Sequence, residues 1–114
     1  MDFKEFQELP PEKQTSETCM AVAKQYGWRL MQVENQTPEI CMAAVQQDGW
    51  ALEYVKTQTP EICMTAVKKA GWALKYVKTQ TPELCMTAVQ QNGWALEYVR
   101  NDALRKTLTK FIAT

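Results

Sequence analysis

Four cysteines are the side chains of this chain with the widest range of chemistry, because a thiolate can act as a nucleophile, form a disulfide or bind zinc. They recur every 22 residues, as Cys19, Cys41, Cys63 and Cys85. Equivalent positions in stacked helical units lie about 8–10 Å apart, whereas a disulfide requires Cα atoms within about 7 Å. Zinc sites favour closely spaced cysteine pairs, often with histidine, and the sequence contains no histidine. We therefore expect core packing residues, no disulfide and no metal site.

The remaining side chains offer no catalytic constellation. General acid–base catalysis needs histidine or paired carboxylates in a cleft, and the only aspartates are Asp2, Asp48 and Asp102. The glycines are single and lie 22 residues apart, so they form no phosphate-binding loop. A cysteine in a core lacks both a base and access to a substrate. We expect no catalytic residues, no cofactor and no enzymatic activity.

An internal repeat dominates the sequence. The segment that begins at Thr37 recurs almost unchanged from Thr59 and from Thr81, and a diverged fourth copy begins at Thr15. Each of these three copies begins with residues that favour a helix start: Thr37 can cap the helix, and Pro38 suits its first position. The apolar stripe that follows consists of Ile40, Cys41, Ala44 and Val45. A fixed period of 22 residues is typical of proteins whose repeats stack and bury their apolar faces against neighbours.

The second half of each repeat predicts a turn and another helix. Gly49 is placed for a left-handed helix end. A second short helix is expected from Trp50 to about Lys56. Because Trp50 and Tyr54 are four residues apart, an α-helix would place their side chains next to each other.

These patterns predict an all-α fold, a right-handed α-solenoid of four helix-turn-helix repeats in a single domain, 1–114. The repeats are 15–36, 37–58, 59–80 and 81–102, preceded by an N-terminal capping segment, 1–14. Residues 103–114 predict a C-terminal capping helix. Its apolar side consists of Leu104, Leu108, Phe111 and Ile112. Because both ends are capped, we expect a monomer of fixed length.

The stretch TPEICMAAVQQDGWALEYVKT, residues 37–57, resembles the bacterial helical repeats classified as domain of unknown function 4116. The shared features are the Thr-Pro-Glu start, the Ala44-Val45 pair, the polar turn before Gly49 and the run from Ala51 to Tyr54. The tryptophan after the glycine and the short linkers depart from that family's pattern. The resemblance covers residues 9–102 and implies a helical repeat fold and bacterial origin, in some members within large secreted effectors. It implies no chemistry and no site residues.

Charge and hydropathy exclude several kinds of partner. Thirteen basic and thirteen acidic side chains cancel, so no global field attracts nucleic acid or an anionic membrane. The apolar stretches are far shorter than the roughly 20 residues that cross a bilayer. The start of the chain lacks the basic and apolar regions of a signal peptide. We expect a cytoplasmic protein without membrane association, and secretion as an effector stays open.

Two sets of residues are candidates for binding a partner. Aromatic side chains recur at two repeat positions: Trp50, Trp72 and Trp94 with Tyr54, Tyr76 and Tyr98. They either fill the space between repeats or form an exposed contact surface. The third repeat also collects lysines in a neutral protein: Lys68, Lys69 and Lys75, with Lys78 nearby. These form either an ordinary solvated face or a contact for an acidic or phosphate-bearing partner.

The expected function is a non-enzymatic interaction scaffold that binds a protein partner through its repeat face, as a small bacterial effector, inhibitor or adaptor. The alternative is a nucleic-acid or phosphate-binding module centred on the basic third repeat. Nucleic acid is the weaker alternative, because such domains usually carry a larger basic excess.

Overall fold

The computed structural model describes residues 15–113, so the capping segment expected at residues 1–14 lies outside the described residues. Within them, α-helices alternate with short 3₁₀ helices, which are labelled η. The α-helices are α2 (Ser16–Gln25), α3 (Pro38–Gln47), α4 (Pro60–Lys69), α5 (Pro82–Gln91) and α6 (Asp102–Ala113). The 3₁₀ helices are η2 (Gly27–Gln32), η3 (Gly49–Tyr54), η4 (Gly71–Tyr76) and η5 (Gly93–Tyr98).

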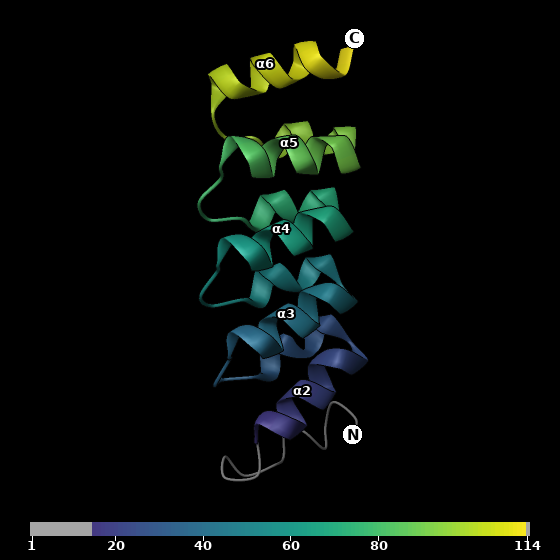
Figure 1. The fold of residues 1–114 in the computed structure, drawn as a ribbon, viewed down its shortest axis with the longest axis vertical. Coiled ribbons are helices and arrows are strands. Elements are labelled where there is room, and N and C mark those ends of the chain that lie inside the picture. Colours follow the sequence, from purple (N-terminus) through teal and green to yellow (C-terminus); the bar gives the residue numbers. More distant parts are fainter. Residues whose placement is uncertain (1–14, 114) are drawn as a thin grey trace.

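The repeats stack along one axis to form a rod of 53 × 19 × 17 Å. Figure 1 shows α3, α4 and α5 one above the other along the length of this rod. Each of these α-helices packs on the α-helix and on the η helix of the preceding repeat, and the η helices pack on one another. The described residues contain no strand. This arrangement confirms the expected all-α solenoid of four helical repeats.

The threonine caps and the apolar stripe confirm the expectations for the first helix of the repeat. The hydroxyl oxygens of Thr37 and Thr59 accept hydrogen bonds of 3.2 Å from backbone amides of the first turn. All four cysteines are buried thiols outside any disulfide, and they form a ladder within the core. They lie beside the Ala-Val pairs, whose side chains are also buried.

The expected left-handed glycine turn is wrong, because none of the four glycines has a positive φ. Helix α3 is instead followed by its C-cap residue Asp48, which is extended, with φ −152° and ψ 113°. A glycine follows because the next repeat approaches closely. A Cβ atom on Gly49 would lie 2.7 Å from the carbonyl oxygen of Ala66, and one on Gly71 would lie 2.5 Å from that of Ala88. The glycine therefore serves packing between repeats.

The second helix of the repeat is a 3₁₀ helix from Gly49 to Tyr54, whereas an α-helix from Trp50 to Lys56 was expected. The Ala51 amide donates to the Asp48 carbonyl at 2.9 Å, which is the i→i+3 pattern of a 3₁₀ helix. Because such a helix has three residues per turn, Trp50 eclipses Glu53 rather than Tyr54. The expected pairing of Trp50 with Tyr54 is therefore wrong, and Trp50 contacts the next repeat instead.

A glutamine in each linker ties neighbouring repeats together, a role that the sequence analysis missed. The Gln80 side-chain amide donates to the carbonyls of Leu74 (3.2 Å) and Tyr98 (2.8 Å), which belong to η4 and η5. Its Oε1 atom accepts from the Arg100 amide at 3.0 Å. Gln36 and Gln58 occupy the same position two repeats and one repeat earlier. Each donates to the carbonyl of the corresponding tyrosine and accepts from the backbone amide two residues after it. We call these residues the glutamine clamp: Gln36, Gln58 and Gln80.

The C-terminal helix α6 covers the last repeat only in part. Leu108 is buried and Leu104 packs against the core, but Phe111 and Ile112, expected on the covered side, are exposed. The linker before α6 is also shorter than the others. Its cap residue Asn101 comes directly after Arg100, so the residue pair that ends in the clamp glutamine elsewhere (Asn35-Gln36, Thr57-Gln58, Thr79-Gln80) is absent. The contact of α6 with the core is made in its first two turns, through Leu104 and Leu108.

Candidate functional site

The tryptophans lie on the face that the η helices present. Trp50 and Trp72 are 40% and 41% exposed, whereas Trp94 is 76% exposed. Trp28 of the diverged first repeat is exposed to a similar degree as Trp50. The tyrosines Tyr54, Tyr76 and Tyr98 are partly buried and pack against the core. We call this surface the aromatic face: Trp28, Trp50, Trp72 and Trp94 with Tyr54, Tyr76 and Tyr98.

The 3₁₀ geometry explains why these residues are at the same time packed and accessible. Positions 49, 52 and 55 share one side of the helix and are buried, while positions 50 and 53 share the outer side and are exposed. The Trp50 ring lies 5.8 Å from the Trp72 ring and 5.9 Å from the Tyr76 ring, measured between centroids. Trp50 and Trp72 therefore fill space between repeats with one part of the ring and meet solvent with the other.

Trp94 is the most exposed member because no further repeat follows it. The adjacent Gly93 is also open, since a Cβ atom there would meet no atom within 4 Å. Between the last two repeats, the side chains of Trp72, Trp94, Glu97 and Tyr98 line a cavity of about 310 Å³. The aromatic face therefore ends in a small pocket that also contains a carboxylate.

Tyr76 is partly buried and lies beside Trp50 of the preceding repeat, with the ring centroids 5.9 Å apart. Burial raises the pKa of its hydroxyl, and the Glu53 carboxylate raises this pKa further through its charge and a hydrogen bond. The Glu53 carboxylate can accept a hydrogen bond only from the neutral phenol, so burial, charge and this bond all favour the neutral form. Glu53 of the second repeat thus interacts with the tyrosine of the third.

The lysines of the third repeat do not form one continuous patch. Lys68 and Lys69 lie exposed in the last turn of α4, where positive charge is favourable to the helix dipole. Lys78 lies in the following linker, and its Nζ atom donates to the Lys56 carbonyl at 3.3 Å, beside the start of α4. Since α4 has ten residues, the two ends of the group lie about 15 Å apart. Lys75 lies beside the aromatic face, with its Nζ atom 5.7 Å from the centre of the Tyr76 ring.

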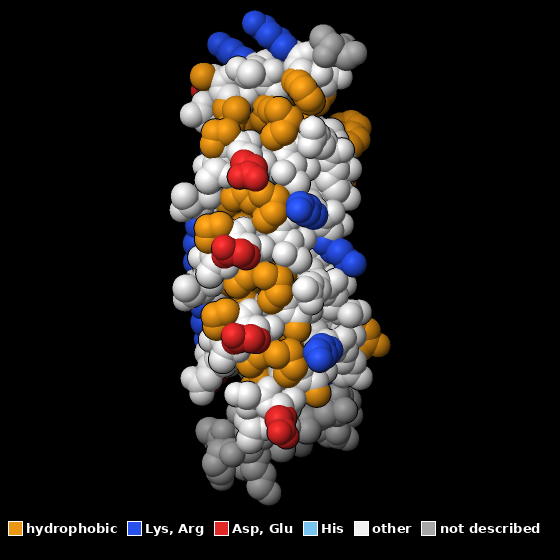
Figure 2. All heavy atoms as spheres, viewed as in Figure 1, with side chains coloured by type: hydrophobic (Ala, Val, Ile, Leu, Met, Phe, Trp, Pro, Cys, Tyr) orange, Lys and Arg blue, Asp and Glu red, His pale blue; other side chains and the backbone are white. Residues whose placement is uncertain are grey.

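The opposite face carries features that the sequence analysis did not assign. Figure 2 shows acidic side chains in a column along the α-helix layer, with apolar side chains between them. Each repeat helix carries one glutamate in its first turn: Glu17, Glu39, Glu61 and Glu83. A methionine recurs at one repeat position, Met20, Met42, Met64 and Met86, and packs at the edge of the core. The repetition of methionine was the available sequence signal.

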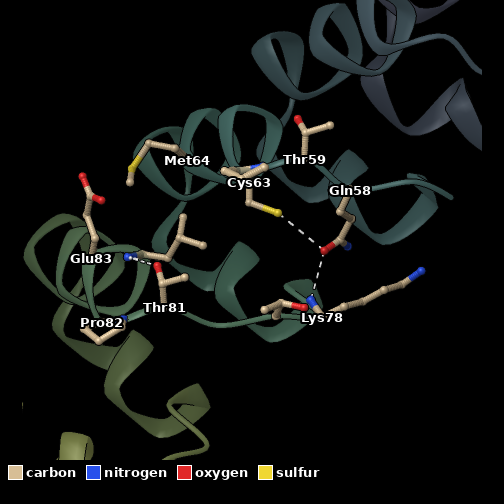
Figure 3. A pocket seen from close by; sticks show the side chains of 11 residues that line it. Gln58, Thr59, Cys63, Met64, Lys78, Thr81, Pro82 and Glu83 are labelled. Atoms are coloured by element: carbon tan, nitrogen blue, oxygen red, sulfur yellow. Dashed lines mark hydrogen bonds between the residues drawn. The ribbon is translucent and has the colours of Figure 1, made fainter.

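A cavity of about 740 Å³ lies between the starts of α4 and α5. Its lining includes Pro60, Met64 and Pro82, with Cys63 at its base. Figure 3 shows the Cys63 thiol directed toward Gln58, whose Oε1 atom lies 3.5 Å from the sulfur. Much of this lining, Gln58 included, belongs to the linkers and helix starts that join the repeats.

The cysteines are poorly suited to nucleophilic chemistry. Burial is the largest cause that raises the pKa of all four thiols, so the reactive thiolate is disfavoured. Among residues 15–113, no group of three or more metal-ligating side chains is arranged to hold an ion. No helix in this part of the chain combines the length and apolar character needed to cross a membrane.

Comparison with known proteins identifies a family. A family model described as Domain of unknown function (DUF4116) matches residues 37–81 and, in an overlapping second match, residues 59–105. Together the two matches cover more than half of the chain. Neither a curated protein nor a solved structure matches the chain.

Proposed function

The chain belongs to the family described as Domain of unknown function (DUF4116), and we propose that it is a non-enzymatic scaffold that binds a protein partner through its aromatic face. One observation carries this proposal: a row of tryptophans, one per repeat, retains about 40% or more of its surface in solvent. Tryptophan and tyrosine dominate the binding energy of protein interfaces when a partner covers them.

The architecture supports this use of the aromatic face. The outer positions of the η helices can change without altering the core, because the 3₁₀ period separates them from the buried positions. Glu53 and Lys75 occupy the same repeat position with opposite charge. The tryptophans provide a constant apolar row, while these neighbouring positions supply charges that can select a partner.

The experiment is affinity capture with the full chain as bait, from extracts of its source cells, followed by mass spectrometry. A Trp72→Ala and Trp94→Ala double variant should lose the captured protein. A Gln46→Ala and Gln90→Ala double variant, which changes exposed side chains of α3 and α5, should retain it. Circular dichroism and thermal unfolding establish that both variants fold.

Two results would overturn the proposal. The first is retention of the captured protein by the folded tryptophan variant. The second is loss of a phosphate-bearing or nucleic-acid partner from a Lys68→Glu and Lys69→Glu variant, with steep salt dependence, while the tryptophan variant still binds. That second result would assign binding to the basic third repeat.

A further inference from the structure

The pocket at the end of the aromatic face has the composition of a cation-binding site. Trp72, Trp94 and Tyr98 contribute three aromatic rings, and Glu97 contributes a carboxylate. Its volume of about 310 Å³ is at the small end for ligand sites, so it suits a single functional group. Aromatic rings carry negative potential on their faces and attract ammonium and guanidinium groups.

In the preceding repeat, a lysine of the chain itself lies beside one of the equivalent aromatic residues. The residues one period earlier are Trp50, Trp72, Lys75 and Tyr76. There the Trp50 ring contacts Trp72 and Tyr76 at 5.8 and 5.9 Å. The Lys75 ammonium lies 5.7 Å from the centre of the Tyr76 ring. The chain therefore places its own alkylammonium group over the tyrosine of this aromatic cluster in the third repeat.

The fourth repeat differs at the residue that supplies the cation. Glu97 replaces Lys75, so a negative charge stands where the third repeat has a positive one. In the second repeat the equivalent Glu53 interacts with a tyrosine of the following repeat, Tyr76. No such repeat follows η5, so Glu97 has no equivalent tyrosine and its side chain is exposed. Its charge remains available to a ligand.

From this internal comparison we propose that the pocket of Trp72, Trp94, Glu97 and Tyr98 binds an alkylammonium group, supplied by a lysine or N-methylated lysine of the partner. The faces of the aromatic rings contact the cation, and the Glu97 carboxylate balances its charge. The inference rests on the proposed function, because the pocket is part of the aromatic face. It adds the chemistry that this face recognises.

The test uses two small probes of the same shape, choline and 3,3-dimethyl-1-butanol, which differ only in the positive charge. Binding is followed by tryptophan fluorescence and by the indole NMR signals of the full chain. Choline should shift the Trp94 and Trp72 signals, whereas the neutral alcohol should bind roughly tenfold more weakly or not at all. Equal binding of both probes, or no binding of choline, would overturn the proposal.

A matched pair of variants locates the site. Glu97→Lys reproduces the third repeat, so its own ammonium should occupy the pocket and abolish choline binding. Glu97→Gln retains the shape without the charge and should weaken choline binding by a few-fold. Glu97 is exposed, so neither change should alter thermal unfolding. Unchanged choline binding by Glu97→Lys would contradict the assignment.

Peptides then separate the possible sources of the cation. Model peptides with lysine, trimethyllysine or norleucine at one position should bind in the order trimethyllysine, lysine, norleucine if the methylated group is the ligand. Tighter binding of the unmodified peptide would show that the ligand of the pocket is an unmethylated lysine side chain. Preference for norleucine would overturn the proposal.

The outcomes also distinguish this inference from the proposed function. Choline binding without any effect of the tryptophan variants on partner capture would support the pocket and refute the proposed partner interface. Partner capture that depends on Trp72 and Trp94 but not on the charge at position 97, together with absent choline binding, would refute the pocket alone.

Discussion

The side-chain amide of Gln58 donates a 2.7 Å hydrogen bond to the carbonyl oxygen of Tyr76, 18 residues further along the chain. The same glutamine accepts from the Lys78 amide at 3.0 Å. These bonds fix the end of η4 against the linker that precedes α4. Because η4 carries Trp72 and Tyr76, the glutamine clamp also positions the aromatic face.

Removal of one clamp should therefore weaken the whole stack. We expect Gln58→Ala to lower the free energy of unfolding by about 1–3 kcal/mol, since it leaves backbone groups without their partner. Gln46→Ala, an exposed change of the same chemistry in α3, should change stability by no more than about 0.5 kcal/mol. Urea unfolding followed by circular dichroism measures both. Equal stabilities for the two variants would show that the clamp bonds add nothing.

Glycine substitutions should depend on whether a repeat follows. Gly71→Ala forces a Cβ atom to within 2.5 Å of the Ala88 carbonyl oxygen, so the repeats must separate. We expect a loss of about 1–3 kcal/mol, as for other overpacked sites. Gly93→Ala meets no atom within 4 Å and requires no positive φ, so it should be neutral or slightly stabilising. Thermal unfolding of the two variants compares them directly, and a similar loss for both would contradict the packing explanation.

Stability should fall at alkaline pH. Burial raises the pKa of the four thiols and of Tyr76 in the folded protein. The unfolded chain then loses these protons at lower pH than the folded one, so the stabilising contribution is complete below about pH 8 and is lost as pH rises further. Unfolding free energies at neutral and alkaline pH should show this decline, and Cys63→Ala should reduce its slope. A flat profile up to about pH 10 would contradict the burial of the thiols.

Fluorescence quenching should rank the tryptophans by exposure. Trp94 is 76% exposed and Trp72 only 41%. Replacing Trp94 by phenylalanine should therefore lower the acrylamide quenching constant of the protein, whereas Trp72→Phe should leave it unchanged or raise it slightly. A larger decrease for Trp72→Phe would show that the end of the stack is covered in solution.

Most of the local structure could be predicted from residue types. Thr37, Pro38 and the buried stripe that contains Cys41 act through short-range capping and periodicity, and the structure confirms them. Two expectations failed at the same place, the segment after each α-helix. A glycine there suggested a left-handed turn, and the residues after it suggested an α-helix. The glycine is instead required by the close approach of the following repeat, and the segment from Gly49 to Tyr54 is a 3₁₀ helix.

The candidate site could be predicted only in its composition. The repetition of tryptophan indicated the aromatic face, and its members do gather on one side of the rod. That Trp94 and Glu97 share a pocket with Trp72 could not be predicted, because it depends on the three-residue turn of η5 and on the position of the preceding repeat. The lysine group was expected as one patch, yet α4 separates its members.

The sequence by itself determined the repeat, its period, the helix starts and the cysteine core, because these follow from interactions between residues close in the chain. The tertiary structure decided which neighbours each repeated residue contacts, and these differ with the position of the repeat in the stack. A Cβ atom on Gly71 would meet the Ala88 carbonyl oxygen of the next repeat, whereas one on Gly93 would meet no atom within 4 Å. That difference arises because contacts between repeats exist only where a neighbour is present, which no single repeat specifies.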